Sequence, residues 1–216
     1  GYDVAVNFHE SKDGACEVVR RIKNDGHRGV AVQANVANGQ AVERMVKKVV
    51  STFGRIDLLV NNAAVFLNNP IRLNAEAEWD TTMDINLKGP FLCAQAVSRH
   101  MLRQQSGNII NIASLGGLQG WVRHLPYSVS KAGIIMLTRV LAKSLAPHVT
   151  VNAIAPGTIL IRGEEDPAIR HVPKKTILLK RYGTASDITD MVVYLATKGR
   201  YITGQVFSID GGRSIQ

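Results

Sequence analysis

The sequence predicts an α/β domain in which a parallel β-sheet carries helices on both faces. Short apolar runs rich in valine and isoleucine alternate along the chain with stretches in which apolar residues recur at helical spacing. The apolar runs are nearly continuous, as in strands that are buried on both faces. Such a sheet is doubly wound, and it binds its ligands beyond the carboxyl ends of its strands.

The strands and helices are expected in regular alternation. Six apolar runs predict strands at residues 4–8, 30–34, 56–61, 108–113, 149–154 and 205–209. Five helices are expected between them, at 13–24, 40–53, 78–103, from Tyr127 onward, and near 186–196. In the second of these, Val42, Met45 and Val46 mark one face, and the helix at Tyr127 begins just after Pro126.

Composition indicates one domain and excludes several classes of protein. The chain has 216 residues, 45% of them hydrophobic, which is enough for a single large core. Apolar runs stay well short of the roughly 18 residues that a membrane span needs, so no membrane association is predicted. Cys16 and Cys93 lack partner spacing, which indicates free thiols and a cytoplasmic location. The six histidines are scattered, and no metal site is expected.

Tyr127 and Lys131 form the most informative pair in the chain. Four residues apart at the start of a predicted helix, their side chains should share one face. A phenol has an ordinary pKa near 10, and lowering that pKa to about 7 requires roughly 4 kcal/mol. One ammonium at ~4 Å supplies about that much at an effective dielectric of ~20. The pair therefore predicts a proton donor, although a helix-surface Tyr–Lys pair has the same spacing.

Four further segments stand at characteristic distances from this pair. They are 60–64 (Val-Asn-Asn-Ala-Ala), 84–89 (Asp-Ile-Asn-Leu-Lys-Gly), 107–117, which contains Ser114 followed by glycines, and 151–157 (Val-Asn-Ala-Ile-Ala-Pro-Gly). In this order, the segments resemble the short-chain dehydrogenase/reductase family, from residue 1 to Gly212. The resemblance implies a Rossmann fold and an NAD(P)(H)-dependent oxidoreductase that transfers hydride between a nicotinamide and a carbonyl or alcohol.

The resemblance also assigns catalytic roles. Tyr127 would protonate the carbonyl oxygen, Ser114 would orient that oxygen, and Lys131 would lower the pKa of Tyr127 and bind the nicotinamide ribose. Asn86 resembles the helix residue that positions a water between the lysine and solvent. A non-catalytic dinucleotide-binding regulatory protein is the alternative from another class. The four intact catalytic positions favour the enzyme.

One part of the family fold is missing from the sequence. Residues 4–8 correspond to the second strand of the family. The first strand, its glycine-rich turn and the first helix should precede them, over roughly 25 residues of a βαβ unit. In the family's strand order 3-2-1-4-5-6-7, that first strand lies between residues 4–8 and 56–61. We therefore expect residues 1–216 to be a single domain that is incomplete at its N-terminus, because two buried strand edges would otherwise lack partners.

The cofactor contacts implied by the resemblance favour NADP(H) over NAD(H). NAD-specific members place a carboxylate at the end of the second strand, where this sequence has Phe8. His9 and Ser11 suit a ribose 2′-phosphate, whereas Glu10 would repel it. The remaining cofactor contacts fall on Asn35, Val36, Asn62, Ala63, Ala64, Pro156, Gly157 and Ile159, together with Tyr127 and Lys131.

Two substrate classes remain open. Much of the chain resembles the 3-oxoacyl-carrier-protein reductases, which would make an acidic acyl carrier protein a partner. The segment that ends in Phe66 resembles the pteridine reductases, in which this phenylalanine stacks on the pterin ring. Against a pterin, Ser114 stands where those enzymes commonly have an aspartate. Phe66, Trp121 and Ser114 are the candidate substrate contacts, although Phe66 and Trp121 are equally suited to ordinary packing.

The net charge of +9 has a simple interpretation. The basic residues are spread over several helices without aromatic residues between them, so we expect a solvated basic surface and no nucleic acid partner. Residues 160–182 are polar and basic and should form a lid over the pocket. The 78–103 helix and the Tyr127 helix pack against neighbouring subunits in the family, which predicts a homotetramer.

Overall fold

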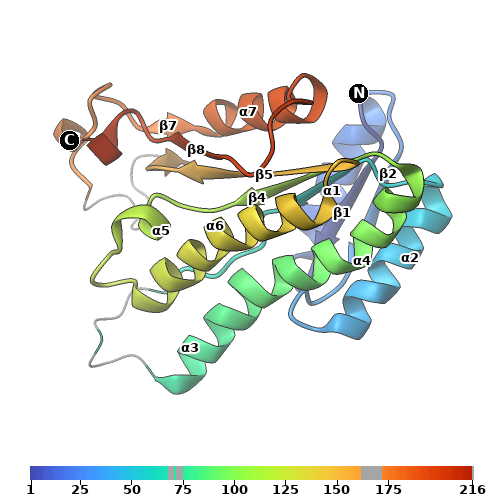
Figure 1. Cartoon of the computed structure of the whole chain (residues 1–216), viewed down its shortest axis with the longest axis horizontal. Helices are drawn as coiled ribbons and strands as arrows, with labels where there is room; N and C mark the ends of the chain where they lie inside the picture. The colour runs from blue at the N-terminus through green and yellow to red at the C-terminus, as the bar shows by residue number, and fades with distance from the viewer. Residues whose placement is uncertain (68–70, 72–74, 162–171, 216) are drawn as a thin grey trace.

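Parallel strands form the middle layer of the computed structural model, which describes residues 1–67, 71, 75–161 and 172–215. Helices α4 (Gly89–Gln104) and α6 (Leu125–Leu145) cover one face of the main sheet, and α7 (Ala185–Thr197) covers the other (Figure 1). The predicted α/β class, with a parallel sheet between helical layers, is confirmed.

The main sheet has the strand order β3-β4-β5-β8, and all its pairs are parallel. Its strands are β3 (Leu58–Asn61), β4 (Gly107–Ile112), β5 (Val149–Pro156) and β8 (Val206–Ile209). Two smaller parallel pairs stand beside it, β1 (Val4–Phe8) with β2 (Gly29–Gln33), and β6 (Ile159–Leu160) with β7 (Gly183–Thr184). The strands of the sequence analysis are therefore found within one or two residues of their predicted bounds.

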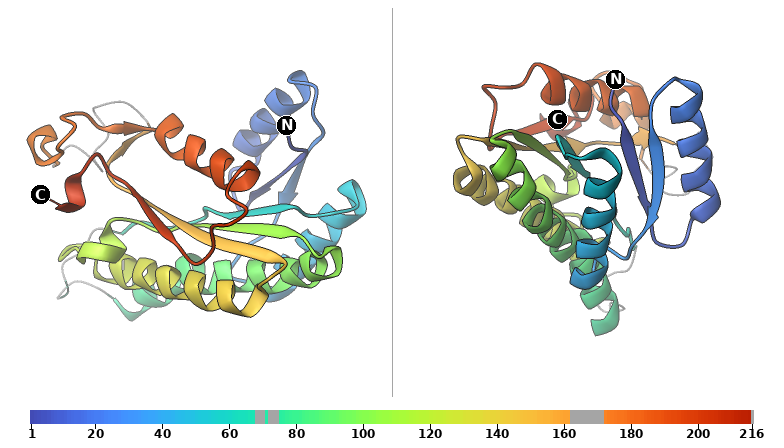
Figure 2. Two further views of the ribbon diagram at one scale, coloured as in Figure 1. Left: turned by 45° about the horizontal axis from the view of Figure 1, so that its top comes forward. Right: turned by 90° about the vertical axis from the view of Figure 1, so that its right-hand side faces the viewer.

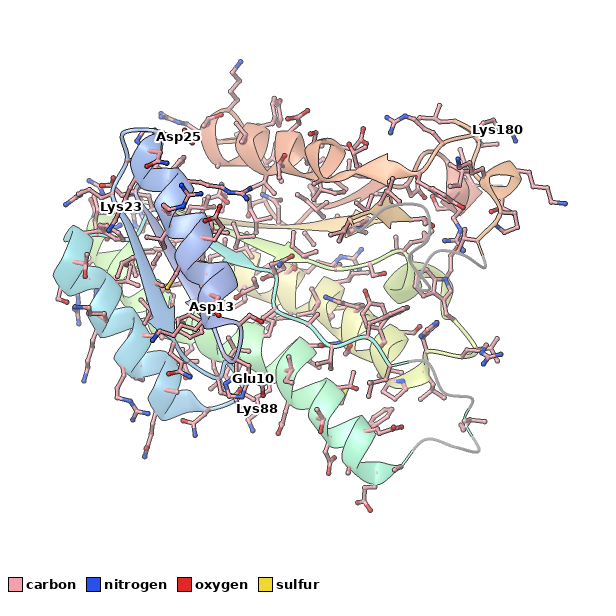
Figure 3. The ribbon with its side chains drawn as sticks, turned by 180° about the vertical axis from the view of Figure 1, so that it is seen from behind. Glu10, Asp13, Lys23, Asp25, Lys88 and Lys180 are labelled. Carbon is pink, nitrogen blue, oxygen red and sulfur yellow. The ribbon has the colours of Figure 1, made fainter. Side chains whose placement is uncertain are left out.

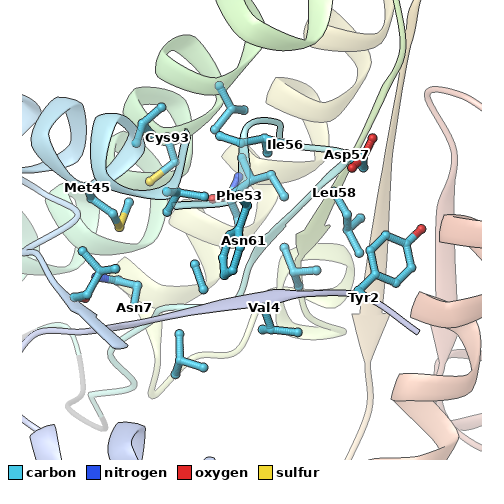
Figure 4. A pocket seen from close by; sticks show the side chains of 18 of the residues that line it. Tyr2, Val4, Asn7, Met45, Phe53, Ile56, Asp57, Leu58, Asn61 and Cys93 are labelled. Carbon is cyan, nitrogen blue, oxygen red and sulfur yellow. The ribbon is translucent and has the colours of Figure 1, made fainter. Parts of the chain in front are cut away.

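A cleft separates β1 from β3, the two strands between which the first strand of the family is expected to lie. The β1–β2 pair stands apart from the four-stranded sheet (Figure 2). The cleft has a volume of about 770 Å³ and is lined by Val4 and Asn7 on one side and by Leu58 and Asn61 on the other (Figure 4). The orders β2-β1 and β3-β4-β5-β8 agree with the predicted order on either side of it. No described residue forms a strand in the place where the sequence analysis expects a further central strand.

The predicted helix at 78–103 is a continuous helical run with a local change of pitch. It consists of α3 (Glu76–Met83), a π-helical segment η2 (Asp84–Lys88) and α4. A π-helical segment within an α-helix is frequent at functional sites, and this one contains Asn86. None of the helices in the described part of the chain is long and apolar enough to cross a membrane.

The remaining helices are short or lie on the periphery. They are α1 (Lys12–Asn24), α2 (Gly39–Phe53), α5 (Gly116–Gln119), and the 3₁₀ turns η3 (Lys174–Thr176) and η4 (Arg213–Ile215). Helix α1 has Asp13 in its first turn and Lys23 in its last, as the helix dipole favours (Figure 3). Residues 162–171 of the predicted lid lie outside the described residues.

Asn111 ties the main sheet to α6. Its side chain is fully buried in β4, where it accepts a hydrogen bond from Asn61 Nδ2 at 2.9 Å. It also donates from Nδ2 to Thr138 Oγ1 on α6, again at 2.9 Å. The Asn111 amide thus joins β3, β4 and α6, the helix that carries Tyr127. These two hydrogen bonds fix the position of α6 relative to the sheet.

Replacing Asn111 with alanine should destabilise the protein. Asn61 and Thr138 would each lose a buried partner, and an unsatisfied buried polar group costs about 1–3 kcal/mol. Urea unfolding of Asn111→Ala should show a loss of that size in the free energy of unfolding. Ser144→Ala, which removes an exposed hydroxyl from the same helix, is the control and should change stability by less than about 0.5 kcal/mol. Equal stability of the two variants would contradict the role of Asn111.

Candidate active site

The predicted functional residues meet at the carboxyl ends of the parallel strands. Asn62 follows β3, Ser114 follows β4, and Gly157 follows β5. The first turns of α6 bring Tyr127 and Lys131 to the same edge. A Cβ atom on Gly117 would lie 2.6 Å from the backbone carbonyl carbon of Lys131, so a glycine is needed for α5 to approach α6 this closely.

Ser114, Tyr127 and Lys131 converge as predicted. Ser114 lies close enough to the Tyr127 phenol to lower its pKa, and Ser114 Oγ accepts a hydrogen bond from the backbone N–H of Gly116 at 3.0 Å. The Lys131 side chain is only 3% exposed, and its Nζ lies 5.6 Å from the centroid of the Tyr127 ring. Lys131 Nζ donates to the backbone carbonyl of Ile112, the last residue of β4, at 2.6 Å.

Burial dominates the protonation of the pair. It raises the pKa of Tyr127 above its ordinary value of 10.0, and the hydrogen bond from Ser114 offsets only part of that rise. Burial also lowers the pKa of Lys131 to about 8. The Lys131 ammonium is directed to the Ile112 carbonyl, and its effect on the pKa of Tyr127 stays a prediction. The phenol holds its proton at neutral pH, as a proton donor must.

The side chain of Asn86 is hydrogen-bonded to the loop that follows β3. Its Oδ1 accepts from the backbone N–H of Val65 at 2.8 Å, and its Nδ2 donates to the Val65 carbonyl at 2.9 Å and to Ser130 Oγ at 3.2 Å. Its side chain thus holds the segment before Phe66 against α6. The water-positioning role implied by the resemblance stays a prediction.

An aromatic wall stands beside the phenol of Tyr127. Phe66 lies edge-on to the Tyr127 ring at 4.7 Å between centroids and stacks on His124 at 4.2 Å. The Trp121 ring is nearly parallel to that of Tyr127, with centroids 6.3 Å apart. His124 is buried, and its Nδ1 lies 2.7 Å from the Leu67 carbonyl oxygen. Phe66 and Trp121 therefore lie beside Tyr127, and their role as substrate contacts stays a prediction.

The predicted adenosine contacts lie at the ends of β1, β2 and β3. His9 is exposed, with its Nε2 3.8 Å from a Glu10 carboxylate oxygen. Ser11 precedes α1 without capping it through its side chain, so its hydroxyl is left available for a ligand. Asn35 Oδ1 accepts from the Ala37 backbone at 2.9 Å, which shapes the turn after β2. The other predicted positions on this side are Val36, which lines the cleft, and Asn62, Ala63 and Ala64, which are exposed.

The predicted nicotinamide contacts follow β5. Pro156 ends that strand, and the backbone N–H of Gly157 donates to the Ile209 carbonyl at 3.0 Å. A Cβ on Gly157 would lie 2.7 Å from Asp210 Cα, so the two chain segments approach as closely as a glycine allows. Ile159 begins β6 immediately beyond.

A nicotinamide nucleotide fits these residues. An ammonium has three N–H donors, and among the described residues Lys131 Nζ has only the Ile112 carbonyl as a hydrogen-bond acceptor. A buried charge of this kind requires further polar partners. Ribose hydroxyls would supply them, next to a tyrosine and a serine that contact one another.

Two neighbours of the site, His124 and Arg213, had no predicted role. Only the folded chain brings them to the aromatic wall. The position of His124, three residues before Tyr127 on the loop that leads into α6, was the one available hint.

Comparison with known proteins agrees with this geometry. Residues 1–214 match the family described as Enoyl-(Acyl carrier protein) reductase. The chain is 45% identical over 221 residues to the 3-oxoacyl-[acyl-carrier-protein] reductase FabG of Staphylococcus epidermidis, a match that covers 98% of this chain and 88% of that protein.

Solved structures show the same likeness. One is a protein described as a short-chain alcohol dehydrogenase from Sinorhizobium meliloti 1021, with a TM-score of 0.92 and 35% identity over 100% of this chain and 88% of that one. Another is a blue fluorescent protein from a metagenomic library in complex with NADPH, with a TM-score of 0.87 and 31% identity over 99% of this chain and 88% of that one.

The fold and the site together define a nicotinamide-dependent oxidoreductase. The chain belongs to the short-chain dehydrogenase/reductase family. It is an enzyme with similarity to 3-oxoacyl reductases, so the alternative of a non-catalytic regulatory protein is dropped.

Lys131 should make the free energy of unfolding depend on pH. Its pKa of about 8 in the folded chain lies below the ordinary 10.5, so between these values the unfolded chain binds more protons. The free energy of unfolding should therefore rise with pH from about 8 toward 10, and this rise should be absent from Lys131→Met. Urea unfolding of both proteins at about pH 7.5 and 9.5 measures the difference. Identical pH dependence would show that Lys131 is not buried as a partly desolvated ammonium.

Proposed function

We propose that the protein is an NADP(H)-dependent reductase of 3-oxoacyl thioesters. The observation that supports this most directly is the convergence of Ser114, Tyr127 and Lys131 at the strand ends. The 45% identity to a 3-oxoacyl-[acyl-carrier-protein] reductase supports the substrate class.

The three side chains divide the work on the substrate oxygen. Ser114 donates to the carbonyl oxygen and holds it beside the Tyr127 phenol. Tyr127, kept protonated by burial, donates its proton to that oxygen as general acid. When bound, the nicotinamide supplies the hydride. Lys131 holds a positive charge near the phenolate that Tyr127 becomes, and its remaining N–H groups would bind the ribose.

The cofactor is proposed to be NADP(H) rather than NAD(H). The end of β1 carries Phe8 where a carboxylate would bind the ribose 2′-hydroxyl. His9 is exposed there, and the Ser11 hydroxyl is not used as a helix cap. Glu10, whose carboxylate oxygen lies 3.8 Å from His9 Nε2, is the neighbour here that would repel a 2′-phosphate.

The assembly is proposed to be a homotetramer. Phe91 on α4 and Val129, Met136 and Val140 on α6 expose between 42% and 55% of their surface. Contiguous exposed apolar side chains of this kind are typical of protein interfaces. They lie on the two helices for which the sequence predicts subunit contacts.

The wider setting is proposed from the same features. Residues 1–216 would belong to one NAD(P)-binding domain, in which a further strand fills the cleft between β1 and β3. The basic charge suits an acidic acyl carrier protein as a partner. The two free thiols suit a cytoplasmic location.

A pterin is the second candidate substrate because of Phe66. The residue is 42% exposed, and its ring lies edge-on to that of Tyr127. Its stacking partner among the described residues is His124, which covers one face of the ring.

A panel of carbonyl substrates separates the two candidates. Oxidation of NADPH and of NADH would be followed in parallel with acetoacetyl thioesters, dihydrobiopterin and simple ketones. The proposal expects turnover of the thioesters, with a higher kcat/KM for NADPH than for NADH. Turnover of the pterin alone would transfer the assignment to the second candidate.

Tyr127→Phe should lower kcat at least about a hundredfold and leave the Kd for NADPH nearly unchanged, because it removes the proton donor alone. Tyr201→Phe removes a hydroxyl from a fully exposed tyrosine and serves as the matched control, with wild-type kinetics expected. Fluorescence titration gives the Kd, and initial rates give kcat. Wild-type turnover in Tyr127→Phe would remove the residue from the role of general acid.

A further inference from the structure

Arg213 places a second cation beside the catalytic groups. Its guanidinium carbon lies 5.6 Å from the centroid of the Trp121 ring, and its Nη1 donates to Thr158 Oγ1 at 2.8 Å. Trp121 in turn stacks on Tyr127, and Thr158 directly follows Gly157. Arg213 therefore borders both the aromatic wall and the segment expected at the nicotinamide.

The turn that carries Arg213 is fixed by backbone hydrogen bonds. Asp210 Oδ1 accepts from the N–H of Gly212 at 2.9 Å, and Oδ2 accepts from the N–H of Ser214 at 2.8 Å. Gly211 and Gly212 have φ angles of 65° and 82°, which other residues rarely adopt. The position of the guanidinium is thus set by the fold rather than by a flexible chain end.

The charge of Arg213 is only partly compensated. Its side chain is half-buried, and burial lowers its pKa while the nearby Asp210 carboxylate opposes that shift. Asp210 uses both oxygens on backbone N–H groups. A guanidinium has five N–H donors; among the described residues, Thr158 Oγ1 is the acceptor that Arg213 has. The remaining donors suit a carboxylate, which arginine binds through two parallel hydrogen bonds.

We propose that Arg213 is a specificity-determining residue that binds a carboxylate on the substrate. The enzyme would then favour 3-oxoacyl thioesters whose acyl chain ends in a carboxylate over neutral chains of the same length. This inference rests on the proposed function and names the substrate class within it.

A matched pair of substrates tests the proposal. The N-acetylcysteamine thioesters of 3-oxoadipate and 3-oxohexanoate have the same number of acyl carbons and differ in the terminal carboxylate. The wild type should show a kcat/KM at least about tenfold higher for 3-oxoadipyl, as expected for one charge-assisted contact. In Arg213→Met this ratio should fall to about one, and Arg213→Lys should retain part of it.

The ratio of the two kcat/KM values reports specificity alone, because a loss of activity that is common to both thioesters cancels. Arg200→Met removes an exposed arginine elsewhere and controls for net charge, and it should keep the wild-type ratio. A wild-type ratio near one would overturn the proposal. So would an unchanged ratio in Arg213→Met, and a lower affinity for NADPH alone in that variant would point to a cofactor contact instead.

Tryptophan fluorescence gives a readout that needs no turnover. The chain has two tryptophans, so in Trp79→Phe the signal comes from Trp121, over which the guanidinium lies. With NADP⁺ present, the 3-oxoadipyl thioester should change the signal at about a tenfold lower concentration than 3-oxohexanoyl, and Arg213→Met should abolish that difference. If the wild type reduces neither thioester, the proposed function fails. The titration then tests by itself whether Arg213 binds the carboxylate. Equal titrations would then overturn its role as well.

Discussion

The hydrogen bond from Lys131 to the Ile112 carbonyl is the contact on which the site depends. It joins the end of β4 to the first turns of α6, and it holds a buried ammonium 5.6 Å from the centroid of the Tyr127 ring. Burying a cation with a single acceptor is unfavourable, and burial lowers the pKa of Lys131 to about 8. The Lys131 ammonium can therefore bind a ligand at the carboxyl ends of the strands, where a doubly wound sheet binds its ligands.

The surroundings of this contact are positioned by packing at the same strand ends. Asn111 joins β3 and β4 to α6, and Asn86 holds the Val65 segment against α6. The segment that contains Val65 also carries Phe66, whose ring lies edge-on to that of Tyr127. The turn after β8 brings Arg213 to Thr158 and to the Trp121 ring. Tyr127 and Lys131 therefore stand on a helix and Ser114 closely follows a strand, whereas the groups proposed to select the substrate come from loops and turns.

Local patterns were enough to predict much of this. The spacing of Tyr127 and Lys131, and a serine at the end of an apolar run, marked three side chains that meet at the strand ends, because each is placed by its own strand or helix. The parallel α/β fold followed from the alternation of strands and helices. Contacts between distant segments were not predictable in this way: the direction of Lys131 toward Ile112, the use of Asn86 on Val65, and the presence of His124 and Arg213. Each is decided by how separate elements pack, which periodicity and spacing do not encode.

The central claim is that one substrate oxygen meets Ser114 and Tyr127 while Lys131 stays on the Ile112 carbonyl. A crystal structure of the enzyme with NADP⁺ and a 3-oxoacyl thioester, a pair between which no hydride transfer occurs, tests it most directly. The account predicts the 3-oxo oxygen within hydrogen-bonding distance of both Ser114 Oγ and the Tyr127 phenol. A ketone oxygen bound away from these two hydroxyls, with the nicotinamide elsewhere, would contradict it.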